Sequence, residues 1–163
     1  MRTTVAFGAT IVALTLGCAA LAADLPKEGS YDFMSCYSGT VNPMEFSKTH
    51  TANTTEIRGT VMSNPPGGLF DKVAFRCISM NYTADGKPSG MTLCEGVDKD
   101  GDKYLSQLVV VDGSQSTRKV VAGTGKYEGM TTSGTSVSVG PFGTTVSGQT
   151  QNCTRQTGTY KLK

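Results

Sequence analysis

The chain has 163 residues, a formal net charge of +2 at neutral pH, 20 glycines and no tryptophan. Its 15 Lys and Arg residues are nearly balanced by 13 Asp and Glu residues and form no basic run, which argues against a nucleic-acid partner. The length suits a single domain around one hydrophobic core.

Residues 1–23 have the pattern of a cleaved export signal. Arg2 provides a positive start, an apolar run follows over residues 5–16, and the small residues after it fit the small-x-small rule of signal peptidase sites. We therefore predict cleavage near Ala22 or Ala23 and a mature domain of residues 24–163. This mature chain is expected in the periplasm or secreted, and it contains no further apolar segment long enough to span a bilayer.

Period-two alternation dominates the mature sequence, and helical periodicity is nearly absent. Alternating or β-branched runs appear in chain order at residues 57–61, 73–78, 91–97, 105–111 and 137–139. Turn signals separate the runs: Asn64 to Gly68, Asp85-Gly86, Asp100-Gly101, Asp112-Gly113, Gly125-Lys126 and Gly140 to Gly143. The pattern predicts about eight antiparallel strands joined as a meander, in a barrel or a sandwich, because open edges invite aggregation.

Five cysteines are present, and we expect Cys18 to leave with the export signal. The remaining four, in an exported chain, predict two disulfides with three alternative connectivities. They are Cys36, Cys77, Cys94 and Cys153. A metal site is disfavoured because no two of them are closely spaced, as in a CxxC pair.

Hairpin geometry selects one pairing. If Asp85-Gly86 is a two-residue loop, Ala84 faces Lys87, and counting back along both strands places Cys77 opposite Cys94. Directly opposed Cα atoms are about 4.5–5.5 Å apart, which suits a disulfide. By elimination, Cys36 pairs with Cys153 and joins the first strand to the last, which requires a closed barrel.

A family likeness appears in the segment 121–129, Val-Ala-Gly-Thr-Gly-Lys-Tyr-Glu-Gly. It resembles the glycine-rich strand of the allene oxide cyclase and dirigent barrels. It is similar also to bacterial exported relatives of undetermined function, in which a GTGKY-x-G segment precedes a Gly-rich strand, here residues 130–134. Residues 94–103 resemble those bacterial relatives too. The resemblance implies a closed, calycin-like barrel of about eight antiparallel strands with a small central cavity.

The resemblance carries no activity to this chain. None of the polar groups that line the plant cyclases' apolar barrel is matched here. Dirigent proteins steer radical coupling with acidic residues inside the barrel, whereas Asp98, Asp100 and Asp102 fall at a predicted turn.

These three aspartates are also the one weak candidate for a metal site. An EF-hand loop needs Gly at position 6 and Glu at position 12. Here Gly101 is at position 4 and Val109 at position 12, so a solvated hairpin turn is the preferred interpretation.

No catalytic residue and no cofactor is predicted. The single histidine, His50, lies in a polar stretch and is expected in a surface loop. A Gly-x-Ser-x-Gly elbow is absent, and disulfide-bonded cysteines are not nucleophiles. The aromatic residues are expected mainly in the core or in cross-strand packing, with a few lining a cavity. They are Tyr31, Phe33, Tyr37, Phe46, Phe70, Phe75, Tyr82, Tyr104, Tyr127, Phe142 and Tyr160.

Three functional hypotheses follow. The favoured one is a non-enzymatic barrel that binds a small apolar ligand or a protein partner. The second is a cyclase- or dirigent-like catalyst that shapes a reactive substrate by positioning and exclusion of water. The third is a structural protein that interacts with other envelope components, which an exposed apolar patch would indicate. The lining of the barrel interior discriminates best among them.

Overall fold

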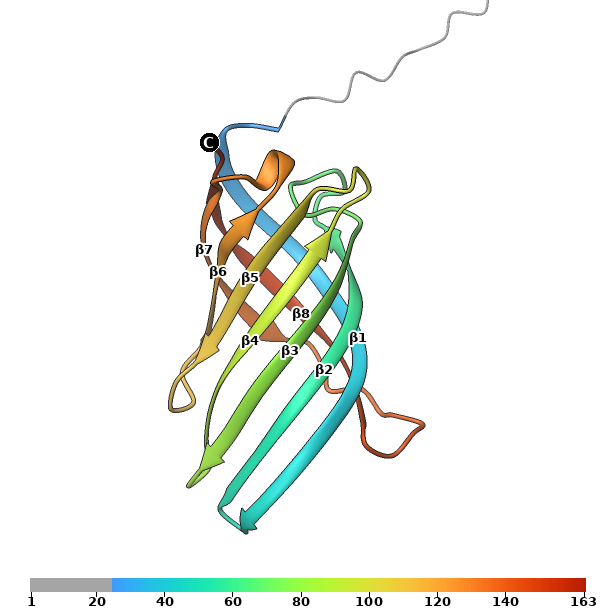
Figure 1. Cartoon of the computed structure of the whole chain (residues 1–163), viewed down its shortest axis with the longest axis vertical. Helices are drawn as coiled ribbons and strands as arrows, with labels where there is room; N and C mark the ends of the chain where they lie inside the picture. The colour runs from blue at the N-terminus through green and yellow to red at the C-terminus, as the bar shows by residue number, and fades with distance from the viewer. Residues whose placement is uncertain (1–24) are drawn as a thin grey trace, which may run out of the picture.

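The computed structural model describes residues 25–163, so the predicted export signal, its cleavage site and Cys18 lie outside the described residues. The domain is an antiparallel barrel in which each strand pairs with the next and the last pairs with the first (Figure 1). Its strands are β1 (Glu28–Ser47), β2 (His50–Ser63), β3 (Val73–Ala84), β4 (Lys87–Val97), β5 (Lys103–Val110), β6 (Ser116–Gly123), β7 (Thr131–Ser138) and β8 (Gln149–Lys161). The predicted closed barrel is confirmed. Within residues 25–163, no helix has the length and apolar character needed to cross a bilayer.

Both predicted disulfides are present. Cys77 faces Cys94 across β3 and β4, and Cys36 faces Cys153 across β1 and β8. The two bridges lie on opposite sides of the wall. Cys77 and Cys94 are buried inside the barrel, whereas Cys36 is exposed on the outer surface.

The turn between β3 and β4 has the predicted two-residue form. Asp85 and Gly86 adopt φ values of 49° and 77°, the left-handed conformation that this hairpin requires. The other two Asp-Gly dipeptides do not form tight hairpins but lie in longer connections, residues 98–102 and 111–115. In the first of these, a side chain sets the loop length, because one carboxylate oxygen of Asp98 accepts the amides of both Asp100 and Asp102.

One end of the barrel is covered, and we call it the closed end. The β2–β3 connection inserts Leu69 and Phe70, and the short 3₁₀ turn η1 (Gly125–Tyr127) inserts Tyr127, near the C-terminus at the top of Figure 1. The Tyr127 hydroxyl donates to the carbonyl of Leu69 at 3.1 Å. The Phe70 ring contacts four aromatic rings at centroid distances of 5.1–6.0 Å: Tyr31, Phe33, Tyr104 and Tyr127. The hydrophobic core therefore lies at this end.

Two glycines make room for this core. Gly134 of β7 and Gly158 of β8 face each other, and the Tyr31 side chain lies against both. A Cβ at either position would come within 2.6 Å of the Tyr31 hydroxyl oxygen. The Gly-rich strand thus serves close packing of an aromatic ring.

Away from the closed end, the strands turn their polar faces inward. On β3, Ser79 and Asn81 point into the barrel, whereas Ile78, Met80 and Tyr82 are 56%, 67% and 53% exposed outside. The expectation that most aromatic residues pack internally holds at the closed end. The exceptions are Tyr82, Phe46 and Phe142, which lie on the exposed surface because they fall on outward-facing or loop positions.

Candidate functional site

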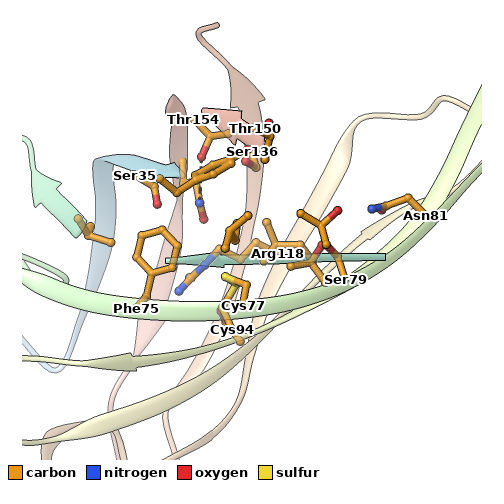
Figure 2. A pocket seen from close by; sticks show the side chains of 18 of the residues that line it. Ser35, Phe75, Cys77, Ser79, Asn81, Cys94, Arg118, Ser136, Thr150 and Thr154 are labelled. Atoms are coloured by element: carbon orange, nitrogen blue, oxygen red, sulfur yellow. Dashed lines mark hydrogen bonds between the residues drawn. A yellow bond between two sulfur atoms is a disulfide. The ribbon is translucent and has the colours of Figure 1, made fainter. Parts of the chain in front are cut away.

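The barrel interior below the core holds a cavity of about 400 Å³ (Figure 2). Side chains from all eight strands line it. Phe33 and Tyr104 bound it toward the closed end, and Val41, Asn53 and Asn81 lie toward the opposite end, which we call the open end. The volume falls in the range of natural small-molecule sites, about 300–1,000 Å³.

The cavity lining is amphipathic. The apolar part comprises Phe33, Tyr37, Val41, Ile57, Val61, Phe75, Tyr104, Leu108 and the Cys77–Cys94 disulfide. The polar part carries hydroxyl and amide groups from Ser35, Asn53, Thr55, Ser79, Asn81, Thr92, Ser106, Ser136, Thr150, Thr154 and Gln156. No Asp or Glu occurs among the described residues that line it, and the one charged side chain is Arg118.

Arg118 extends from β6 into the cavity and is 3% exposed (Figure 2). Its guanidinium carbon lies 4.7 Å from the ring centroid of Phe70, 5.3 Å from that of Phe33, and 5.5 Å from those of Tyr31 and Tyr104. Each such contact between a cation and an aromatic face contributes about 0.5–2 kcal/mol. The rings therefore offset part of the cost of burying this charge.

The rings do not satisfy the hydrogen-bonding capacity of Arg118. A guanidinium has N–H donors in its own plane, whereas an aromatic ring offers only its diffuse face. The Nη1 atom is buried without a hydrogen-bond partner, and none of the ion pairs formed within residues 25–163 includes Arg118. A buried cation without a carboxylate is unusual, because desolvation of an unpaired ion is costly.

The neighbouring polar groups are neutral hydroxyls and amides, which can both donate and accept hydrogen bonds. Burial raises the pKa of Tyr104 despite the opposing positive charge of Arg118, so its phenol stays protonated at neutral pH. Burial likewise raises the pKa of Tyr37 and outweighs the hydrogen bond from Asn152. Both tyrosines can therefore donate hydrogen bonds but are poor bases. The buried Oε1 of Gln156 is an acceptor without a partner.

Comparison of the chain with protein-family models, with curated proteins and with solved structures gave no match. The chemistry of the cavity is therefore the basis for a functional proposal. That chemistry consists of one buried cation, a set of neutral hydroxyl and amide groups, and an apolar wall, all held on paired strands.

The carboxylates of the aspartate turn, Asp98, Asp100 and Asp102, interact with other groups of the chain. Lys126 Nζ lies 2.5 Å from Asp98 and 3.1 Å from Asp100, and the Asp102 carboxylate accepts the Lys126 amide at 3.1 Å. Lys126 thus offsets part of the negative charge of the cluster and ties the β4–β5 turn to η1. Within residues 25–163, no three His, Cys, Asp or Glu side chains are grouped as metal ligands.

The charge pairing at this turn is visible in the pKa values. Burial alone would raise the pKa of Asp98, but the hydrogen bonds from Lys126 and the Asp100 amide, with the positive charge of Lys126, lower it overall. Burial would lower the pKa of Lys126, and its two carboxylate partners raise it. Each charge therefore stabilises the other in the folded state.

His50 is exposed at the start of β2, directly after the β1–β2 turn, and does not line the cavity. Its Nδ1 is 3.0 Å from the Thr49 hydroxyl and 3.3 Å from that of Ser47. These contacts are local turn contacts, in agreement with the predicted surface loop.

Arg118 was not predicted as a site residue, although the sequence around it carries a signal. Arg118 and Lys119 are adjacent in a strand, and adjacent strand residues point to opposite faces. In a closed barrel, one of two neighbouring cations must therefore face the interior. Lys119 is exposed, and Arg118 is the buried member.

Proposed function

We propose that this protein is an exported binding barrel that holds one small, predominantly apolar molecule in its interior. The observation that supports this most directly is the cavity of about 400 Å³, whose lining combines an apolar wall with a few directed polar groups. Natural ligand sites have this composition, since the apolar wall provides affinity and the polar groups fix orientation.

The rigidity of the wall also supports binding. Each strand is paired with both of its neighbours, and the Cys77–Cys94 bridge lies in the cavity wall itself. A preformed site avoids the entropic cost of ordering its side chains when a ligand enters. Export is supported by the two disulfides, which persist in oxidising compartments such as the periplasm or the extracellular medium.

A neutral fluorescent probe, N-phenylnaphthylamine, tests this proposal. We expect its emission to rise on binding to the wild type and to be lost in Ser79→Trp, which fills the cavity from β3. Met80→Trp is the matched control, because Met80 is the next residue and points outward. Native mass spectrometry of gently purified protein should also reveal a bound molecule. Equal probe binding by both variants, with no co-purifying molecule, would argue against an interior site.

A second candidate function, binding of a protein partner, is favoured by the outer surface. Met44, Ile78, Met80, Tyr82 and Met91 are exposed there, and we call them the apolar outer face. Met80 and Met91 are directly paired across β3 and β4. Contiguous exposed apolar side chains of this kind are typical of interaction surfaces. A cyclase- or dirigent-like catalyst stays a prediction, supported by Tyr37 and Tyr104 in the cavity lining.

A further inference from the structure

We propose that the ligand of this barrel is an organic acid, which enters with its carboxylate directed to Arg118 and leaves its apolar body against the cavity wall. This inference rests on the proposed binding function and specifies the charge of the ligand. It begins from Arg118, a cation that is 3% exposed, lines the cavity, and has no acidic partner within residues 25–163.

The environment of the guanidinium selects an anion. The four rings around Arg118 stabilise positive charge through their faces, and the Tyr104 hydroxyl is the one ring substituent that acts as a hydrogen-bond partner of the guanidinium. Its Nη1 donor is buried and unpartnered. A carboxylate is the group whose geometry matches a guanidinium, through two parallel N–H···O bonds. A cationic ligand would instead meet repulsion in a low-dielectric site.

The other polar groups of the cavity fit the same ligand. The hydroxyls of Ser35 and Ser106 are buried in the lining, and the protonated Tyr104 lies beside the guanidinium. Hydroxyl groups can turn their hydrogens toward a carboxylate, so they supplement the charge of Arg118. The unpartnered Gln156 Oε1 is available to a hydroxyl or N–H group on the ligand body.

The rest of the cavity receives an apolar body. Ile57, Phe75 and Leu108 line the wall, together with the Cys77–Cys94 disulfide. These groups offer no charge and no strong hydrogen bond, so their contribution is burial of apolar area. An acid with an aromatic or branched hydrocarbon body of limited size therefore complements both parts of the site.

Three matched ligands test this inference by calorimetry on the mature protein: naphthylacetate, naphthylethanol and naphthylethylammonium. They share one apolar body and differ in charge. We expect the acid to bind at least about tenfold more tightly than the alcohol, and the ammonium compound to bind most weakly. Arg118→Met should remove the preference for the acid while naphthylethanol still binds. Lys119→Met is the matched control, because it removes the neighbouring, outward-facing cation and should keep the preference.

The outcomes separate this inference from the function on which it rests. If acid and alcohol bind the wild type equally, the assignment of an organic acid is wrong and the binding barrel stands. If none of the three compounds and no neutral probe binds, the binding function itself is wrong. Should Arg118→Met fail to fold, the comparison of the three ligands on the wild type still decides the matter. Arg118→Lys then adds a readout, since it keeps the charge but loses the two-pronged geometry and should bind the acid with intermediate affinity.

Discussion

At the closed end, the side chain of Asp98 is 2% exposed and makes several contacts at once. One oxygen accepts the amides of Asp100 and Asp102, and the other pairs with Lys126. These contacts connect the β4–β5 turn to η1, whose Tyr127 in turn holds Leu69. The aspartate turn, for which a solvated hairpin was the preferred interpretation and a metal site the weak alternative, is thus held by interactions within the chain, and its Asp98 side chain is buried instead of solvated.

We expect Asp98→Asn to lower the free energy of unfolding at pH 7 by about 1–2 kcal/mol, because the amide keeps one acceptor oxygen but loses the charge opposite Lys126. The pKa of Asp98 is lowered in the folded state, so its stabilisation is complete above the unfolded pKa and is lost as the pH falls through the folded pKa. The difference between wild type and variant should therefore shrink below about pH 4. Urea unfolding across this range measures it.

Lys99→Ala provides the control for this prediction. Its ion pair with Asp100 is exposed, with side chains 68% and 50% accessible, and such pairs contribute about 0–1 kcal/mol. A loss in Lys99→Ala as large as that in Asp98→Asn would contradict a specific role for the buried carboxylate.

The segments that resemble the cyclase and dirigent barrels contact each other in this fold. Residues 94–103 contain the aspartate turn, residues 121–129 contain η1, and Lys126 joins them. The Thr124 hydroxyl also accepts the Lys103 amide, and the Lys103 carbonyl accepts the Thr124 amide. Gly125 allows this contact, because a Cβ there would collide with the Asp102 carboxylate. In this chain, the two segments on which the resemblance rests therefore contribute to closure of one barrel end.

The two disulfides differ in the length of chain that they close. Cys36 and Cys153 are 117 residues apart, and Cys77 and Cys94 are 17 apart. On the loop-entropy relation, we expect the double variant Cys36→Ala/Cys153→Ala to lose about 5 kcal/mol and Cys77→Ala/Cys94→Ala about 3 kcal/mol. Urea midpoints of the two double variants give the comparison, and equal losses would show that loop length does not govern the effect.

The two disulfides also differ in solvent exposure, and this difference should determine which of them is reduced first. Cys36 is exposed on the outer surface, whereas Cys77 is 2% exposed inside the barrel. Mild reductant followed by alkylation should label Cys36 and Cys153 first, as peptide mapping can show. If Cys77 and Cys94 were labelled before Cys36 and Cys153, the reductant would reach the barrel interior more readily than the outer wall.

For the molecule as a whole, the usual arrangement of apolar side chains inside and polar side chains outside is partly reversed. Ser79 and Asn81 face the cavity, while Met80 and Tyr82 on the same strand face outward. A barrel whose interior were filled by apolar side chains would have no room for a ligand. On this strand, the small polar side chains face the cavity, and the larger apolar side chains form part of the apolar outer face.

We expect this outer face to promote association of the protein with itself at high concentration, because burial of contiguous apolar surface is favourable. Met80→Glu should shift the protein toward the monomer in sedimentation or light-scattering measurements. Thr159→Glu, which adds the same charge at an exposed position on β8, is the control. The expected self-association through the apolar outer face would be contradicted if the wild type stayed monomeric at every concentration. It would also be contradicted if both variants had the same effect.

The sequence by itself determined the all-β meander and the pairing of Cys77 with Cys94, whereas closure of the barrel followed only from elimination of the second cysteine pair and from the family resemblance. Period-two alternation and the Asp85-Gly86 turn are local properties, and a fixed hairpin register places Cys77 opposite Cys94 without further information. The pairing of Cys36 with Cys153 then required the first and last strands to be neighbours.

Only the tertiary structure decided which face of each strand points inward. An alternating strand can place either its odd-numbered or its even-numbered residues inside, and closure of the barrel selects one of these two arrangements. The adjacent cations Arg118 and Lys119 could therefore not be assigned to their faces from local sequence. Phe70 enters the core from a loop that carries no periodic signal. The cavity and its buried cation depend on both outcomes, because a cavity is a property of side chains that meet from distant parts of the chain.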